Sequence, residues 1–158
     1  MPGKIFYKCL FGLCAVMPWA LKKFVFRQLL SFRIEEGTYI GFSYVDCRDV
    51  VLRRGARIGH LNFIRGISLD LGEKSKIGNL NRITGLPAGS TRHFFDQDRR
   101  NPTLRLGRQA SITSRHCIDC CDLVDIGEFT TIAGLGTQIF THGIDVKTAR
   151  LLTAPVRI

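Results

Sequence analysis

The 158-residue sequence has little proline and no Asn-Gly or Asp-Gly dipeptide. Those dipeptides favour the tight turns of β-hairpins, so their absence counts against a β-sandwich or propeller. With only 5 prolines and 16 scattered glycines, the chain is not collagen-like or of low complexity. Apolar residues make up 45% of the chain, which is enough for one core in a single domain.

Cysteine is too sparse and unevenly spaced for a disulfide-stapled fold, and no signal-peptide cleavage pattern precedes it. The six cysteines occupy positions 9, 14, 47, 117, 120 and 121. We therefore expect reduced thiols in a cytoplasmic protein. Cys117, Cys120 and Cys121 form a C-x-x-C-C pattern, but tetrahedral zinc would need a fourth ligand and a second cysteine pair. No metal site is predicted.

Acidic residues are missing from residues 1–33, which contain six lysines and arginines and so supply most of the formal charge of +10. The longest uncharged stretch, Cys9 to Leu21, has 13 residues and contains Gly12 and Pro18. A single span of a bilayer needs about 20 residues. Apolar residues among the cations instead predict one or two broken amphipathic helices in this leader.

The sequence leaves the partner of this leader open. We favour peripheral contact with the inner face of the cell membrane, where anionic lipids attract lysine and arginine. The alternative is that its apolar face docks on the rest of the protein or on a partner subunit. A signal peptide is disfavoured because Lys22 and Lys23 follow without a cleavage site. No recognised nucleic-acid motif accompanies the charge, so nucleic acid is not an expected partner.

From residue 34 onward, aliphatic residues recur six positions apart, a period that excludes an α-helix and fits short strands separated by turns. These groups are Ile34 and Ile40; Leu52, Ile58 and Ile64; Leu71, Ile77 and Ile83; Leu106, Ile112 and Ile118; and Ile126 and Ile132. Glycine often follows the aliphatic residue, as at Gly59 and Gly72, where a missing Cβ is expected to let the backbone bend. The pattern is a hexapeptide repeat, typical of a parallel β-helix.

Three hexapeptides form one coil of about 18 residues, so residues 34–140 predict roughly five stacked coils. The spacing between Leu71 and Leu106 is longer because residues 84–103 are inserted. This insertion is polar and rich in glycine, proline and charge, so it is expected to be a loop that leaves one corner of the coil. The predicted organisation is a basic leader, residues 1–33, followed by a β-helix domain, residues 34–158.

Several blocks resemble the hexapeptide-repeat acyltransferases, especially colanic-acid-type acetyltransferases. They include ARIGHLNFIRG (56–66), LGRQASITSRHCIDC (106–120) and, most specifically, TIAGLGTQIFTHGID (131–145). The resemblance implies an all-β fold, a left-handed parallel β-helix that forms a homotrimer. It also implies transfer of an acetyl or other acyl group from coenzyme A to a sugar hydroxyl in surface-polysaccharide synthesis. Residues 153–158 resemble the start of a further coil, so the β-helix is expected to be incomplete at the C-terminus of this chain.

Acyl transfer to a hydroxyl needs a base near neutrality, a role that suits histidine. His142 directly follows a repeat and begins a stretch that leaves the hexapeptide rhythm. In the family the matching histidine is the general base, which implies that role for His142. Asp145 is a candidate to orient the imidazole; a turn-capping role is the alternative.

Further candidates are expected to bind substrate. Ser114 occupies a position where the resembling family has asparagine that contacts the acceptor or acetyl group. His116 and Asp119 are candidates to line the acceptor pocket, with turn residues as the alternative. Arg92 and His93, in the insertion, are candidates to hold a sugar or phosphate over the cleft; a solvated loop is the alternative. The second functional hypothesis is a non-catalytic β-helix that binds glycan or assembles with a full-length transferase.

Overall fold

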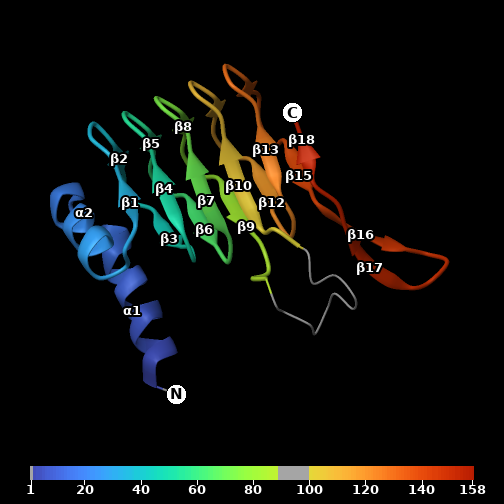
Figure 1. Cartoon of the computed structure of the whole chain (residues 1–158), viewed down its shortest axis with the longest axis horizontal. Coiled ribbons are helices and arrows are strands. Elements are labelled where there is room, and N and C mark those ends of the chain that lie inside the picture. Colours follow the sequence, from blue (N-terminus) through green and yellow to red (C-terminus); the bar gives the residue numbers. More distant parts are fainter. Residues whose placement is uncertain (1, 89–99) are drawn as a thin grey trace.

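The computed structural model describes residues 2–88 and 100–158, with the backbone alone for residues 2–7. Two helices are followed by short strands that wind as a three-sided coil (Figure 1). Each turn of the coil gives one strand to each of three parallel sheets, because every strand of these sheets pairs with the strand one coil before or after it. This arrangement is that of a parallel β-helix, as the period of six predicts.

The three sheets extend along the coil, and consecutive strands within each sheet are hydrogen-bonded to one another. The first sheet contains β1 (Arg33–Ile34), β4 (Val50–Leu52), β7 (Ser68–Leu71), β10 (Thr103–Leu106), β13 (Val124–Ile126) and β18 (Val156–Arg157). The second contains β14 (Thr131–Ile132), β11 (Ser111–Ile112), β8 (Lys76–Ile77), β5 (Arg57–Ile58) and β2 (Tyr39–Ile40). The third contains β15 (Gln138–Phe140), β12 (Cys117–Asp119), β9 (Arg82–Thr84), β6 (Phe63–Arg65) and β3 (Tyr44–Asp46).

The aliphatic residues of the repeat stack inside the coil. In the second sheet, Ile58 pairs in register with Ile40 on one side and Ile77 on the other. In the third sheet, Ile64 and Ile83 are neighbours and both are fully buried. Because side chains alternate along a strand, the residues on either side of each buried one point outward. The predicted core of five coils is confirmed, and the outward positions carry the surface chemistry.

The glycines after the aliphatic residues do not bend the chain, so the expected reason for them is wrong. None of Gly59, Gly72 or Gly78 has a positive φ. The left-handed residues lie two positions later, as at Leu61 and Lys74. A Cβ on Gly72 would instead lie 2.6 Å from the backbone of the next coil. Glycine is needed at these positions because two coils approach each other closely.

A ladder of buried polar side chains joins neighbouring coils along one corner. The amide nitrogen of Asn62 donates to Oγ of Ser43 at 3.0 Å, and that of Asn81 donates to Oδ1 of Asn62 at 2.9 Å. The amide of His116 then donates to Oδ1 of Asn81 at 2.9 Å, and Nδ1 of His116 accepts from the amide of Thr137 at 3.2 Å. These bonds satisfy backbone groups at the turns and help to fix the register of successive coils.

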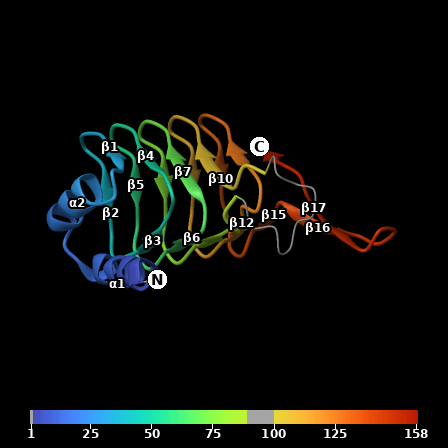
Figure 2. The same cartoon turned by 60° about the horizontal axis from the view of Figure 1, so that its bottom comes forward.

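Helices α1 (Pro2–Val16) and α2 (Trp19–Gln28) cover the first coil, at the opposite end from β18 (Figure 2). The break between them falls at Pro18, which provides the N-cap of α2. Phe11 and Phe26 are buried in the same core as the aliphatic residues of the coil. The docking interpretation of the leader therefore holds for one of its faces. No helix in the described part of the chain is long and apolar enough to cross a membrane.

Two excursions leave the coil at the same corner, between a strand of the third sheet and the next strand of the first. β9 ends at Thr84, and β10 begins at Thr103. Between β15 and β18, strands β16 (His142–Asp145) and β17 (Arg150–Thr153) form an antiparallel hairpin that projects from the coil (Figure 1). Residues 85–88 and 100–102 beside the insertion, and the first residues of the hairpin, therefore lie along the same corner of the three-sided coil.

The close approach of the coils predicts a steric effect at Gly72. Gly72→Ala would place Cβ against backbone atoms of Gly107 and Arg108, which cannot rotate away. Overpacking of this kind destabilises by about 1–3 kcal/mol. Gly143→Ala is the control, because a Cβ there has no neighbour within 4 Å. Urea unfolding should show a loss for Gly72→Ala only, and equal midpoints would contradict the stacking argument.

Lys22 predicts a pH dependence of stability, because it is fully buried and its Nζ donates to the carbonyl of Gly41 at 2.6 Å. Burial lowers the pKa of Lys22 to about 8 from its ordinary value of 10.5. The unfolded chain therefore binds more protons than the folded chain between these values, so stability rises with pH across this range.

Between pH 7.5 and 10.5, the free energy of unfolding of the wild type should rise by up to about 3 kcal/mol relative to that of Lys22→Met. Guanidinium unfolding at several pH values measures this difference. Burial raises the pKa of the nearby Cys14, which acts in the opposite direction but is present in both proteins. Parallel pH profiles for the two proteins would show that folding does not lower the pKa of Lys22.

Candidate functional site

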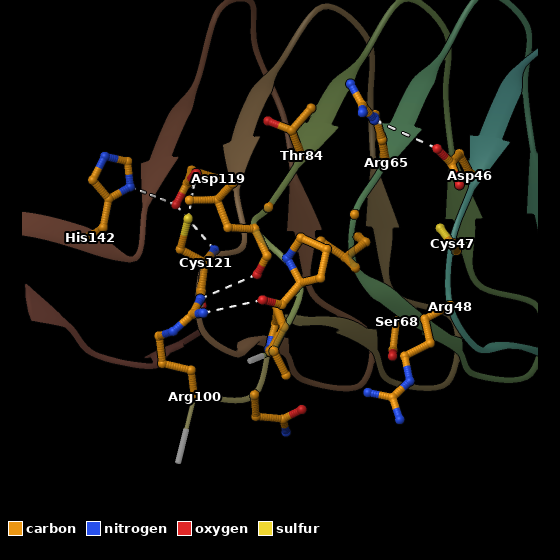
Figure 3. Close-up of a pocket in the computed structure, with 18 of the residues that line it drawn as sticks. Asp46, Cys47, Arg48, Arg65, Ser68, Thr84, Arg100, Asp119, Cys121 and His142 are labelled. Carbon is orange, nitrogen blue, oxygen red and sulfur yellow. Dashed lines mark hydrogen bonds and ion pairs between the residues drawn. The ribbon is translucent and has the colours of Figure 1, made fainter. Parts of the chain in front are cut away.

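A groove of about 710 Å³ follows the corner where both excursions leave the coil. Residues from successive turns line it, from Asp46 in the first coil to His142 in the hairpin (Figure 3). The flanks of the insertion form part of the wall, and Leu151 of the hairpin also lines it. The groove is therefore built from the outward positions of the third sheet and the turns that follow them.

The last residue of each strand in the third sheet forms a column along this groove. In register, Asp46 lies beside Arg65, Arg65 beside Thr84, and Thr84 beside Asp119. The preceding residue of each strand is buried, so this column must face outward. Nε of Arg65 lies 3.6 Å from the carboxylate of Asp46 (Figure 3).

His142 and Asp119 meet at the end of this column. Nδ1 of His142 lies 2.8 Å from Oδ1 of Asp119, although the two residues are 23 positions apart. Asp119 ends β12 and His142 begins β16, and β15, which pairs with β12, brings them together. The imidazole keeps 36% of its side-chain surface exposed and the carboxylate 15%, so the histidine is open to the groove while its partner is largely covered.

The surroundings of Asp119 favour its ionised form. Burial alone raises the pKa of Asp119, but hydrogen bonds from His142 and from the amide and thiol of Cys121 hold its pKa below the ordinary value. The hydroxyl of Thr141 also donates to Oδ1 of Asp119 at 3.1 Å. An ionised carboxylate can only accept hydrogen bonds, so Nδ1 of His142 must carry the proton. A neutral His142 therefore presents a basic Nε2.

Asp145 does not orient the histidine. It lies three positions after His142 in the same strand, and residues at that spacing point to opposite faces. Its carboxylate accepts instead from the amide of Lys147 at 3.0 Å and the hydroxyl of Thr148 at 2.7 Å, within the hairpin turn. Asp145 therefore caps the turn of the hairpin, and Asp119 is the carboxylate that is placed to orient the imidazole of His142.

The other candidates are spread over different surroundings. His116 is buried in the polar ladder, and its Nε2 pairs with Oγ1 of Thr113 at 2.8 Å. Burial lowers the pKa of His116, which favours the neutral ring that the ladder requires. Oγ of Ser114 accepts from the amide of Asn79 at 3.0 Å, as a turn residue does. Neither lines the groove. Arg92 and His93 lie outside the described residues.

Three arginines of the groove were not singled out from the sequence. Arg48, Arg65 and Arg82 line it, with their side chains largely in solvent. Arg100 also lines it, and its guanidinium donates to the carbonyls of Leu86, Pro87 and Cys121, so it holds the flanks of the insertion against the coil. With Asp46 and Asp119 as the acidic lining residues, the groove has a positive balance. The repeat could have placed Arg65 beside Asp46, because both residues end strands of the third sheet. Arg82 begins β9 and Arg48 lies between β3 and β4, so no single position of the repeat identifies the set.

The side chains around the contact between His142 and Asp119 include ligand atoms that suit a transition metal. Asp119, Cys121 and His142 each offer one ligand atom, and these atoms lie within 4.8 Å of one another. Hydrogen bonds already join them, because the thiol of Cys121 donates to Oδ2 of Asp119 at 3.3 Å. Burial raises the pKa of Cys121 to about 11, so at neutral pH this residue is a thiol donor to the carboxylate.

Comparisons with models of protein families, with curated proteins and with solved structures found no match. The chemistry of the site therefore has to be argued from its own geometry and from the sequence pattern.

The contact between His142 and Asp119 predicts a fixed tautomer. Long-range ¹H–¹⁵N NMR spectra above the imidazole titration should show His142 with its proton on Nδ1. In Asp119→Asn this preference should weaken, because a neutral amide can donate as well as accept. Asp145→Asn serves as the control and should leave the signals unchanged. A proton on Nε2 in the wild type would contradict the assignment of Asp119 as the acceptor.

Proposed function

We propose that this chain is a coenzyme A-dependent O-acyltransferase of the left-handed β-helix class. Its acceptor would be a sugar hydroxyl in the synthesis of a surface polysaccharide. The observation that carries the proposal is the contact between His142 and Asp119 at the mouth of a groove. The resemblance of residues 131–145 to the hexapeptide acyltransferases supports the reaction type.

The residues of the pair divide the proton chemistry between them. The acceptor hydroxyl gives its proton to Nε2 of His142 as its oxygen bonds to the thioester carbon. The carboxylate of Asp119 stabilises the imidazolium that forms. The tetrahedral intermediate then collapses, the carbon–sulfur bond breaks, and the proton passes from His142 to the departing coenzyme A sulfur. The products are the O-acyl sugar and free coenzyme A.

A homotrimer would complete the cleft around this pair. Ile144 and Val146 on the hairpin are 70% and 89% exposed, and Leu152 on the facing strand is 45% exposed. An apolar arm that projects from the coil suits contact with a neighbouring subunit. In the resembling family, acyl-coenzyme A and the acceptor meet between neighbouring β-helices, which supports placing His142 at such a junction.

The second candidate is a β-helix that binds an acidic glycan without catalysis or assembles with a full-length transferase. The arginines of the groove favour this alternative, because guanidinium groups bind carboxylates and phosphates in a planar, two-point geometry. It predicts glycan binding that does not depend on a basic imidazole.

Transfer should depend on His142 and, more weakly, on Asp119. The assay uses acetyl-coenzyme A as the donor and surface-glycan fragments as acceptors, and it measures the rate at which the thiol of coenzyme A is released. This rate should fall about 10²–10⁴-fold in His142→Ala. Asp119→Asn should lower kcat about tenfold or more with little change in KM, because it acts through the imidazole. The control, Asp145→Asn, should keep full activity.

Activity in the wild type should be lost at acid pH, because a protonated imidazole cannot accept the proton of the acceptor hydroxyl. Dialysis against EDTA tests the metal-binding alternative, and the proposal expects activity to persist. Acyl transfer that survives in His142→Ala would contradict the role of His142 as the base. Transfer that is absent at every pH tested, while glycan binding is retained, would favour the non-catalytic hypothesis.

A further inference from the structure

Each helix of the leader leaves an apolar face in solvent after docking on the coil. Phe11 and Cys14 of α1 are buried, whereas Leu13 and Val16, one turn apart, are 59% and 69% exposed. In α2 the buried residues include Phe26, while exposed apolar side chains remain on the other side. These are Leu21 at 53%, Phe24 at 62% and, directly after the helix, Leu29 at 59%. Exposed large apolar side chains are thus concentrated in one short segment of the chain, which is typical of an interaction surface.

The same segment carries positive charge with no acidic residue before Glu35. Lys8 and Arg27 are exposed and Lys23 is half-buried. Lys22 of α2 does not contribute to this surface, because its side chain is fully buried and donates to the carbonyl of Gly41. Exposed leucine and phenylalanine beside lysine and arginine are the composition of helices that lie in a lipid headgroup layer.

A hollow of about 380 Å³ lies where α2 meets the first coil. Its basic lining residues are Lys23, Arg27 and Arg54, and its acidic ones are Glu35 and Glu36. Oε2 of Glu35 accepts from the backbone amide of Arg54 at 2.7 Å, so part of its charge is directed to the coil. The three basic side chains outnumber the two carboxylates, so the hollow has a small positive balance toward a phosphate group.

We propose that the outer face of α1 and α2, defined by Leu13, Val16, Leu21, Phe24 and Leu29, docks on a bilayer that contains anionic phospholipid. The apolar side chains enter the interface, and the cations of the leader contact the phosphates. A second copy of the chain fits this face poorly, because two surfaces that both lack acids and carry several cations repel each other. This inference does not depend on acyl transfer.

The position of the helices determines how the coil would be oriented on the bilayer. They cover one end of the coil, and the hairpin with His142 is near the other end (Figures 1 and 2). Coils are about 4.8 Å apart, so five of them hold His142 about 20 Å from the bilayer-facing end. Docking therefore leaves the groove open to solvent.

Vesicle sedimentation of the full chain tests the proposal, with phosphatidylcholine vesicles compared with vesicles containing about 30% phosphatidylglycerol. The wild type should bind the anionic vesicles at least about tenfold more tightly, and added salt should weaken this binding. The fluorescence of Trp19, the single tryptophan of the sequence and the first residue of α2, should shift to shorter wavelength on binding.

Paired charge substitutions separate the helices from the rest of the surface. Val16→Glu with Phe24→Glu should reduce binding to anionic vesicles at least tenfold, because both side chains are exposed and the fold does not need them. The matched control is Phe129→Glu with Leu135→Glu, two residues that are 59% and 74% exposed near the other end of the coil. It adds the same negative charge and should leave the binding within about twofold of wild type.

Circular dichroism and unfolding midpoints check that both double variants fold. Equal affinity for neutral and anionic vesicles, absence of binding, or the same loss in both double variants would overturn the proposal. So would self-association, measured by light scattering without lipid, that Val16→Glu with Phe24→Glu abolishes, because the occupant would then be a second copy.

Discussion

Everything in this molecule depends on coils that stack in register at the spacing of hydrogen-bonded strands. That spacing leaves no room for a Cβ at Gly59 or Gly72, where the next coil passes directly over the backbone. It also lets buried Asn62 and Asn81 bond to the coil before and after them. The core of isoleucine and leucine supplies the driving force, but the glycines and the polar ladder determine which residues lie above one another.

Register converts distant positions into neighbours, and the site is a consequence of it. His142 and Asp119 are 23 residues apart, yet their side chains are within hydrogen-bond distance because β15 lies on β12. The hairpin adds the second requirement, since it takes His142 out of the repeat and away from the core. A histidine that continued the repeat would be enclosed like His116, where both ring nitrogens are engaged by the turn. The same residue type is structural in the ladder and chemically available at the excursion.

The sequence predicts the coil well and the site in part, for a physical reason. A period of six is a local signal repeated many times, so the strands and their inward faces follow from it directly. The partner of His142 depends on which positions of two coils are opposed, and Asp119, rather than the nearby Asp145, has that place. Lys22 was counted among the surface cations of the leader, but a buried carbonyl, that of Gly41, is its partner. Contacts of this kind depend on which residues of different coils lie opposite each other, and the sequence of a single repeat does not determine that.

The leader shows why an amphipathic segment can satisfy two demands at once. A stack of coils ends in an open core and in strand edges, and both need a cover. Phe11, Val25 and Phe26 provide it from one side of the helices. A segment needed only as a cover would place polar residues on its other side, as Arg27 and Gln28 do. Leu13, Val16 and Phe24 do the opposite at a cost in solubility, so their presence is better explained by a second surface than by the core they do not touch.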